Sequence, residues 1–126
     1  MLETGQKTDP FTIPTDTGSF SSTDDAGGKT VVFFFPRADT SGCTKEAVAF
    51  SGLLDEFAAA GCRVIGISKD TAAKQAIFRA KHSLTCELGA DDETGICEQF
   101  GVWLEKSMYG KSYMGIQRAT FVLDSD

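Results

Sequence analysis

The segment from Phe35 to Glu46, FPRADTSGCTKE, contains Cys43, the side chain best suited to nucleophilic chemistry in this sequence. An apolar strand precedes this segment and a helical pattern follows it, so we expect Cys43 where a loop enters a helix. Free amide groups at a helix start carry partial positive charge, and a thiol there more easily becomes a nucleophilic thiolate. The hydroxyl of Thr40 could hydrogen-bond the sulfur. Pro36, with its fixed φ, can restrain the loop and shield the site around the sulfur from bulk water.

Two elements on either side must position this loop. The run Thr30 to Phe35, TVVFFF, is continuously apolar and predicts a strand buried on both faces, which belongs inside a sheet covered by helices. From Thr44 to Ala60, apolar residues recur at three- and four-residue steps and predict one helix, stopped by Gly61.

The rest of the chain continues as alternating strands and helices. We expect strands at Arg63 to Ser68, Cys86 to Leu88 and Ala119 to Leu123, and helices from Asp70 or Thr71 to about Lys81 and from Glu93 to Phe100. Thr15 to Lys29 is rich in Thr, Ser, Asp and Gly and indicates a hairpin or loop. The order predicts an α/β fold whose first β–α–β unit is parallel and right-handed.

Composition limits the classes of partner. The 126 residues predict one domain, residues 1–126, and the hydrophobic and charged fractions of 41% and 24% are those of an ordinary globular protein. A net charge of −6 disfavours nucleic acid and anionic membranes as partners. The amino terminus has neither a basic start nor an apolar stretch, and no run is long enough to span a bilayer, so we expect a cytoplasmic protein.

The four cysteines are separate in the sequence. Positions 43, 62, 86 and 97 form no Cys-x-x-Cys pair and no zinc-like spacing with the one histidine, His82. In a reducing compartment they are expected to be individual thiols.

Pro36, Thr40 and Cys43 together match Pro-x-x-x-Thr-x-x-Cys, and in this pattern the chain resembles the active-site segment of the peroxiredoxins. The longer stretches ADTSGCTKEA, LLDEFAAAGCRVIGIS and FGVWLEKSMYGKSYMGIQRATFVLD resemble the bacterioferritin comigratory protein or peroxiredoxin Q branch, and the likeness covers nearly the whole chain. It implies a thioredoxin-like α/β fold with a central mixed β-sheet flanked by helices. It also implies that Arg118, in GIQRATF, completes the peroxide site.

This resemblance implies an antioxidant, thioredoxin-dependent peroxidase that acts on hydrogen peroxide and organic hydroperoxides and contributes to cell redox homeostasis. Cys43 would take one peroxide oxygen and become a sulfenic acid, while water or an alcohol leaves. Arg118 would stabilise the thiolate and polarise the peroxide bond. No metal, haem or flavin cofactor is implied, and we expect a monomer.

The sequence departs from the family in three places. Val48 and Arg79 stand where relatives carry a second, resolving cysteine, so intramolecular resolution would have to use Cys62, Cys86 or Cys97. We expect those three to fill the core, and therefore a one-cysteine cycle in which thioredoxin, glutaredoxin or a low-molecular-weight thiol such as glutathione reduces the sulfenic acid. The chain ends at LDSD, before the C-terminal strand and helix usual in the family.

Other interpretations stay open at this point. Cys43 could instead be the thiol switch of a redox sensor or chaperone-like binding protein, whereas a disulfide reductase is disfavoured because the nearby second thiol is missing. Thr40 could cap the helix, and Arg118 could be a surface ion-pair partner. Glu46 could orient Arg118, and Arg37, Asp39 and Lys45 are expected to face solvent.

Overall fold

The computed structural model describes residues 3, 5–6, 8–22, 28–38 and 41–123. Its elements along the chain are β1 (Thr12–Thr15), β2 (Gly18–Ser21), β3 (Lys29–Phe34), α1 (Ser41–Gly52), α2 (Leu54–Ala59), β4 (Cys62–Ser68), α3 (Ala72–His82), β5 (Glu87–Ala90), α4 (Ile96–Gln99), β6 (Trp103–Met108), β7 (Lys111–Ile116) and β8 (Ala119–Leu123).

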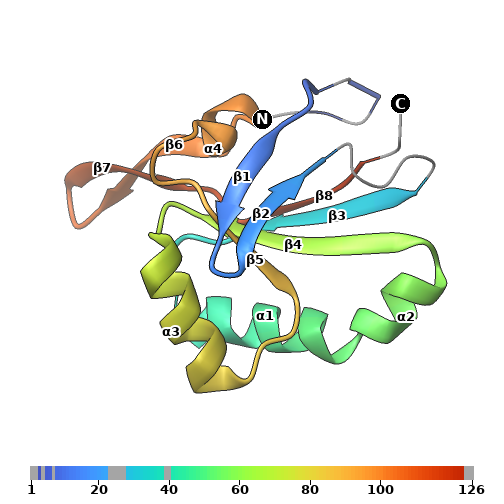
Figure 1. Ribbon diagram of the computed structural model, residues 1–126. Coiled ribbons are helices and arrows are strands. Elements are labelled where there is room, and N and C mark those ends of the chain that lie inside the picture. The colour runs from blue at the N-terminus through green and yellow to red at the C-terminus, as the bar shows by residue number, and fades with distance from the viewer. Residues whose placement is uncertain (1–2, 4, 7, 23–27, 39–40, 124–126) are drawn as a thin grey trace.

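A six-stranded mixed sheet in the order β2-β1-β5-β4-β3-β8 forms the centre of the molecule (Figure 1). Strands β3, β4 and β5 are parallel, as the β–α–β pattern predicts, while β1 runs antiparallel to β5 and β8 runs antiparallel to β3. Helices α1, α2 and α3 lie against one face of the sheet and α4 lies on the other. The predicted α/β class with a central mixed sheet flanked by helices is confirmed.

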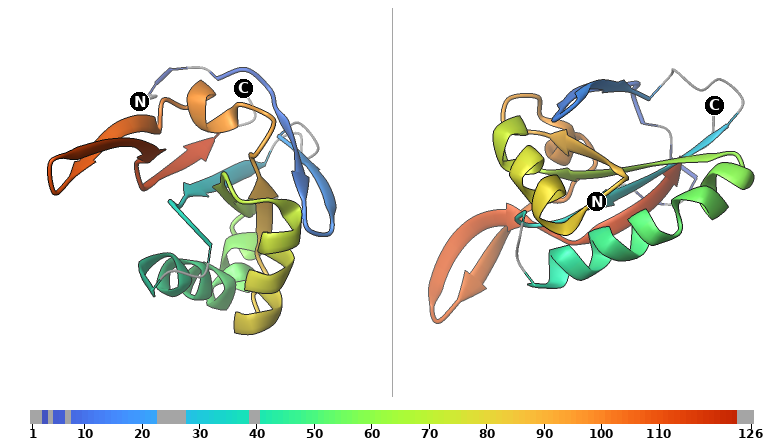
Figure 2. Two further views of the ribbon diagram at one scale, coloured as in Figure 1. Left: turned by 90° about the vertical axis from the view of Figure 1, so that its left-hand side faces the viewer. Right: turned by 60° about the horizontal axis from the view of Figure 1, so that its bottom comes forward.

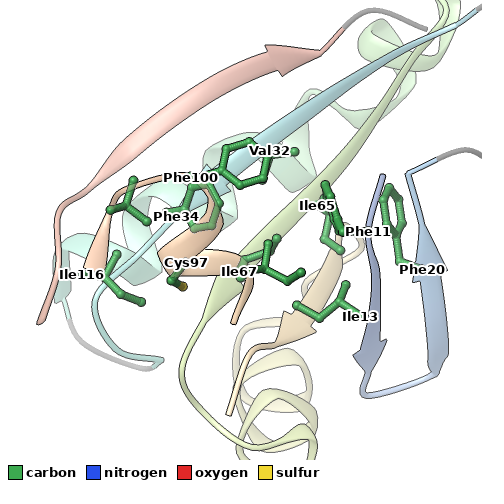
Figure 3. Packing of buried hydrophobic residues seen from close by; sticks show 12 residues of the cluster. Phe11, Ile13, Phe20, Val32, Phe34, Ile65, Ile67, Cys97, Phe100 and Ile116 are labelled. Atoms are coloured by element: carbon green, nitrogen blue, oxygen red, sulfur yellow. The ribbon is translucent and has the colours of Figure 1, made fainter. Parts of the chain in front are cut away.

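Strand β3 is buried on both faces, as its continuous apolar run predicts. Val31, Phe33 and Phe35 belong to the cluster under α1 and α3. Val32 and Phe34 belong to the cluster on the opposite face, together with Ile65 and Ile67 of β4 (Figure 3). Because side chains alternate along a strand, one short segment joins the two halves of the core.

Gly66 in β4 lies directly beneath the ring of Phe33. A Cβ at this position would stand 2.4 Å from that ring, closer than two carbon atoms can approach, so only glycine fits there. The glycine in RVIGIS thus lets the tip of the Phe33 ring pack directly against the backbone of β4.

The prediction of a single helix over residues 44–60 is wrong, because the structure has two helices there, α1 and α2. Gly52 closes α1, and Leu53, at φ −104° and ψ 7°, bonds through its amide to Phe50 O at 3.2 Å, which is a tighter turn than an α-helix makes. Glycine has a low helix propensity, so the break falls at the weakest position. The apolar spacing is maintained across the break, and Phe50, Leu54 and Phe57 all pack on the same cluster.

The β6–β7 hairpin is a feature that the sequence pattern does not reveal. It forms a separate two-stranded sheet that extends away from the main body (Figure 2). Most side chains of β7 are exposed, so the period-two alternation that marks a half-buried strand is missing. The hairpin leads directly into Arg118 and β8.

Candidate active site

Cys43 is the third residue of α1 and is 1% exposed. Its sulfur therefore lies in the first turn of the helix, where backbone amides have no intrahelical partner. Burial in the cluster of Phe35 and Ala47 removes bulk water from the sulfur. A thiol here experiences the positive end of the helix in a medium of low dielectric constant.

The segment between β3 and α1 is anchored to the end of β4. The amide of Phe35 donates to Ile67 O at 3.0 Å, and the amide of Ala38 donates to Oδ2 of Asp70 at 2.7 Å. The same Oδ2 accepts the hydroxyl of Ser68 at 2.7 Å. Asp70 thus fixes the backbone five residues before Cys43 against the adjacent strand.

Arg118 reaches the same place from the other end of the chain. Strand β8 pairs with β3 so that Ala119 stands opposite Phe34, which brings Arg118 beside the start of α1. Its Nη2 donates to the sulfur of Cys43 at 3.0 Å, and its Nη1 donates to Oε1 of Glu46 at 2.9 Å. One guanidinium therefore bridges the thiol and a carboxylate one turn further along α1.

The guanidinium of Arg118 keeps its positive charge. Partial burial by itself lowers the pKa of the guanidinium, but its hydrogen bond to Cys43 and the charges of Cys43 and Glu46 outweigh burial and raise the pKa overall. The Arg118 side chain is 38% exposed, so the guanidinium itself stays in contact with solvent although the sulfur is buried. The site pairs a buried thiol with a permanent, partly accessible cation.

The structure brings together two of the four site residues expected from the sequence, Cys43 and Arg118. Pro36 lies in the bend after β3 and is exposed. Thr40 lies outside the described residues, so its hydrogen bond to the sulfur stays a prediction. Glu46, which sequence reasoning left open, contacts Arg118 directly.

Asp70 is a site-supporting residue that sequence reasoning assigned differently. The sequence allowed Asp70 or Thr71 as the cap of α3, and Thr71 takes this role by accepting the amide of Lys74 at 3.2 Å. Asp70 is then available to hold Ala38.

Comparison with known proteins agrees with this geometry. The AhpC/TSA family model matches residues 4–126. The chain belongs to the AhpC/TSA family. It is 40% identical to Peroxiredoxin Bcp of Escherichia coli K12 over 99% of this chain and 81% of that protein.

Solved structures place the chain in the same branch. The fold matches a crystal structure of peroxidoxin BcpB from Mycobacterium tuberculosis with a TM-score of 0.86 and 37% identity, over 100% of this chain and 81% of that one. It also matches the Xanthomonas campestris bacterioferritin comigratory protein, from a study of that protein's alkyl peroxide reduction, with a TM-score of 0.84 and 34% identity, over 91% and 74%. The predicted resemblance to the Bcp and peroxiredoxin Q branch is confirmed, and the chain is a peroxiredoxin, a peroxidase of the oxidoreductase class.

The other three cysteines of this peroxiredoxin are free thiols, and Cys86 belongs to the same buried cluster as Cys43. Cys62 opens β4 opposite Lys29, at the far end of β3. The sulfur of Cys86 accepts the hydroxyl of Ser51, near the end of α1, at 3.3 Å. Cys97 belongs to the cluster on the opposite face of the sheet (Figure 3).

Two of these thiols are held in their protonated form. Burial raises the pKa of Cys86, and the hydrogen bond from Ser51 and the charge of Arg79 only partly offset it. Burial also raises the pKa of Cys97, and a hydrogen bond to the carboxylate of Asp91 raises it further. Both are poor nucleophiles at neutral pH, because the thiolate is the reactive form.

Arg79 stands where some relatives carry an alternative resolving cysteine, and in this structure it has a structural role. It donates to both oxygens of Asp16 in the β1–β2 turn and to the carbonyls of Leu84 and Cys86 at 2.9 Å each. It therefore ties α3 to the β1–β2 turn and to the segment that leads into β5.

Within the described residues, no group of three or more His, Cys, Asp or Glu side chains is arranged to hold a metal ion. None of the helices found in that part of the chain is both long enough and apolar enough to cross a membrane.

Proposed function

We propose that this peroxiredoxin reduces hydrogen peroxide and organic hydroperoxides through Cys43, with Arg118, Thr40 and Pro36 completing the site. The observation that carries the proposal is the 3.0 Å hydrogen bond from Nη2 of Arg118 to the sulfur of Cys43. The alkyl peroxide reduction named for the Xanthomonas campestris relative supports organic substrates as well.

The chemical step is an in-line displacement at oxygen. The Cys43 thiolate forms a bond to one peroxide oxygen as the O–O bond breaks, and the departing oxygen takes a proton to leave as water or an alcohol. The sulfur is oxidised to a sulfenic acid and the peroxide is reduced. Arg118 stabilises the thiolate and the charge that develops on the departing oxygen, and the buried site strengthens both interactions.

We further propose a one-cysteine cycle. A disulfide needs α-carbons within about 7 Å of each other. Ser51, which holds the Cys86 sulfur, stands about two turns, or roughly 12 Å, along α1 from Cys43. Cys62 is removed from Cys43 by the length of β3, roughly 17 Å or more, because it pairs with the first residue of that strand.

Cys97 is also badly placed to form a disulfide with Cys43, since the central sheet separates it from α1. Val48, at the usual position of a resolving cysteine, is 47% exposed on the outer side of the same helix. The positions of the three other cysteines and of Val48 favour reduction of the Cys43 sulfenic acid by an external reductant, namely thioredoxin, glutaredoxin or a low-molecular-weight thiol. We expect the single domain, residues 1–126, to act as a cytoplasmic monomer without nucleic-acid or membrane partners.

The test is peroxide consumption with dithiothreitol as reductant, in the native chain and in Cys43→Ser and Arg118→Ala. Cys62→Ser is the matched control, because it removes a half-buried thiol elsewhere. We expect many turnovers in the native chain and in the control, and none in Cys43→Ser. Turnover that survives Cys43→Ser would refute the proposal. If the native chain consumed only one equivalent of peroxide, the result would favour the alternative function, a thiol switch.

A further inference from the structure

Gln75 of α3 is a polar side chain in a fully buried position, where a protein core normally holds an apolar one. Its Nε2 donates to the hydroxyl of Ser68 at the end of β4 and to the carbonyl of Gly89 in β5, at 2.9 Å each. Its Oε1 is also buried and accepts no hydrogen bond from the residues that the structure describes. A buried amide oxygen without a donor lowers stability, so core packing alone does not explain Gln75.

The two hydrogen bonds of Gln75 set the orientation of the Ser68 hydroxyl. If the amide were turned over, Oε1 would point at the Gly89 carbonyl, and two acceptors repel each other. The oxygen of Ser68 also accepts the backbone amide of Asp70, at 3.3 Å. Because both lone pairs of this oxygen are then occupied, the hydroxyl hydrogen of Ser68 is donated to Oδ2 of Asp70, 2.7 Å away.

This series of hydrogen bonds ends on the segment that leads to Cys43. Oδ2 of Asp70 accepts the hydroxyl of Ser68 and the amide of Ala38, at 2.7 Å each. Ser68 is itself held in the sheet, because its carbonyl accepts the amide of Asp91 at 2.8 Å as a continuation of the β4–β5 pairing. We call this series the Gln75 relay, and its members in order are Gly89, Gln75, Ser68, Asp70 and Ala38.

The position of the segment before α1 determines how Cys43 meets Arg118. Nη2 of Arg118 lies 3.0 Å from the sulfur, and a Cβ at Gly42 would stand 3.4 Å from the same nitrogen, so the guanidinium packs against the backbone of the first turn of α1. Arg118 reaches this turn from β8, whereas the Gln75 relay holds the segment from β4 and α3. A shift of that segment would therefore move the sulfur relative to the strand that carries Arg118, and small displacements of reacting groups reduce rates strongly.

We propose that Gln75, Ser68 and Asp70 are positioning residues of the peroxide reaction, which hold the sulfur of Cys43 where Arg118 can stabilise the thiolate and the departing oxygen. This proposal rests on the proposed peroxidase function. None of the three belongs to the site residues expected from the sequence, and they act through the backbone of the segment before α1. The unmet Oε1 of Gln75 is then the loss of stability that accompanies a fixed orientation of Ser68.

The experiment measures the rate constant of Cys43 with hydrogen peroxide by rapid mixing, in variants made with and without Arg118→Ala. Asp70→Ala removes the acceptor of the relay, whereas Asp70→Asn keeps an oxygen that can accept the same two donors. Gln75→Met keeps a buried side chain of similar length and removes both donors. Ile65→Val, a buried change in the cluster on the opposite face of the sheet, is the control for a general loss of stability, and urea midpoints are measured for every variant.

We expect Asp70→Ala to lower the rate constant about tenfold, Gln75→Met about fivefold, and Asp70→Asn and Ile65→Val by less than about twofold. In the Arg118→Ala background, Asp70→Ala and Gln75→Met should each change the rate by less than about twofold, because the contact that they position is already gone. Unchanged rates, equal losses with and without Arg118, or a loss that Ile65→Val reproduces would overturn the proposal. Peroxide turnover with dithiothreitol that depends on Cys43 would leave the peroxidase function intact in each of these cases.

Discussion

Arg118 Nη2 lies 3.0 Å from the sulfur of Cys43, although the two residues are 75 positions apart in the chain. The contact exists because β8 runs antiparallel to β3 and places Ala119 opposite Phe34, next to the loop that enters α1. The same guanidinium holds Glu46, so its position is set from both sides. This geometry leads to the predictions for Arg118 and Glu46, and the burial and pairing of other groups lead to three more.

Arg118→Ala should lower the rate constant of Cys43 with peroxide by about 10²- to 10³-fold, the usual cost of removing a donor aimed at developing charge. Arg118→Lys should recover part of the rate, since an ammonium keeps the charge but lacks the planar fork that contacts both Cys43 and Glu46. Rapid-mixing measurement of sulfenic acid formation checks this. The melting temperature should hardly change, because the side chain is 38% exposed, and a large drop would show a structural role instead.

Glu46→Gln should have a smaller effect on the same rate constant. The amide oxygen can still accept from Arg118, but the charge that holds the guanidinium is lost, so we expect a decrease of about threefold. Glu46→Ala should cost more, because both the charge and the acceptor are gone. A Glu46→Gln variant as slow as Arg118→Ala would mean that Glu46 takes part in the chemistry directly.

The cysteines should differ in their reactivity towards iodoacetamide at mildly alkaline pH. Burial raises the pKa of both Cys86 and Cys97, so these thiols stay protonated and should be alkylated last. Cys62 is only half-buried and should react earlier. Prior treatment with peroxide should protect Cys43 alone, and mass spectrometry of the peptides checks the order. An internal disulfide after peroxide treatment would contradict the one-cysteine cycle.

Asp91 should contribute to stability in a pH-dependent way. Burial by itself raises the pKa of this carboxyl, but hydrogen bonds from Thr94, Cys97 and Ile96 outweigh burial and lower it. Folding therefore favours the carboxylate, and its contribution is present above the unfolded pKa of about 3.9 and lost as pH falls through the lower folded value.

We expect Asp91→Asn to reduce the free energy of unfolding by about 2 kcal/mol at neutral pH, and this difference to shrink below about pH 4. Urea titrations of the native chain and the variant across pH give the measurement. Asp92→Asn, at an exposed neighbouring position, is the matched control. A difference that grows as pH falls would contradict the sign of the shift.

Arg79→Ala should destabilise the fold by about 3 kcal/mol, because it leaves the buried carboxylate of Asp16 without its cation. The double variant Arg79→Ala, Asp16→Asn should recover part of this loss, since the charge left behind is then removed. Urea midpoints of the two single variants and the double variant measure the coupling. Additive losses would show that the ion pair does not matter.

The local elements could be predicted where a short-range period is strong. The apolar run of β3 and the turn residues around it indicated a buried strand followed by a loop and a helix, and Ala119 to Leu123 matches β8 at both ends. The break at Gly52 and the β6–β7 hairpin could not be predicted. In both cases the deciding factor is packing: the apolar face continues across the break, and the exposed hairpin has no buried face to produce a pattern.

The sequence by itself led to the proposal of Cys43 as the nucleophile, because Pro36, Thr40 and Cys43 occupy a pattern that can be read within eight residues, and resemblance pointed to Arg118. Only the tertiary structure decided that Arg118 contacts both Cys43 and Glu46 and that Asp70 anchors Ala38. It also decided that Cys86 lies beside Ser51 near the end of α1, and Cys97 on the opposite face of the sheet. These relationships depend on strand pairing between distant parts of the chain and on which face of the sheet a residue occupies. Side-chain spacing along the sequence encodes the period of an element, but not the partner against which that element packs.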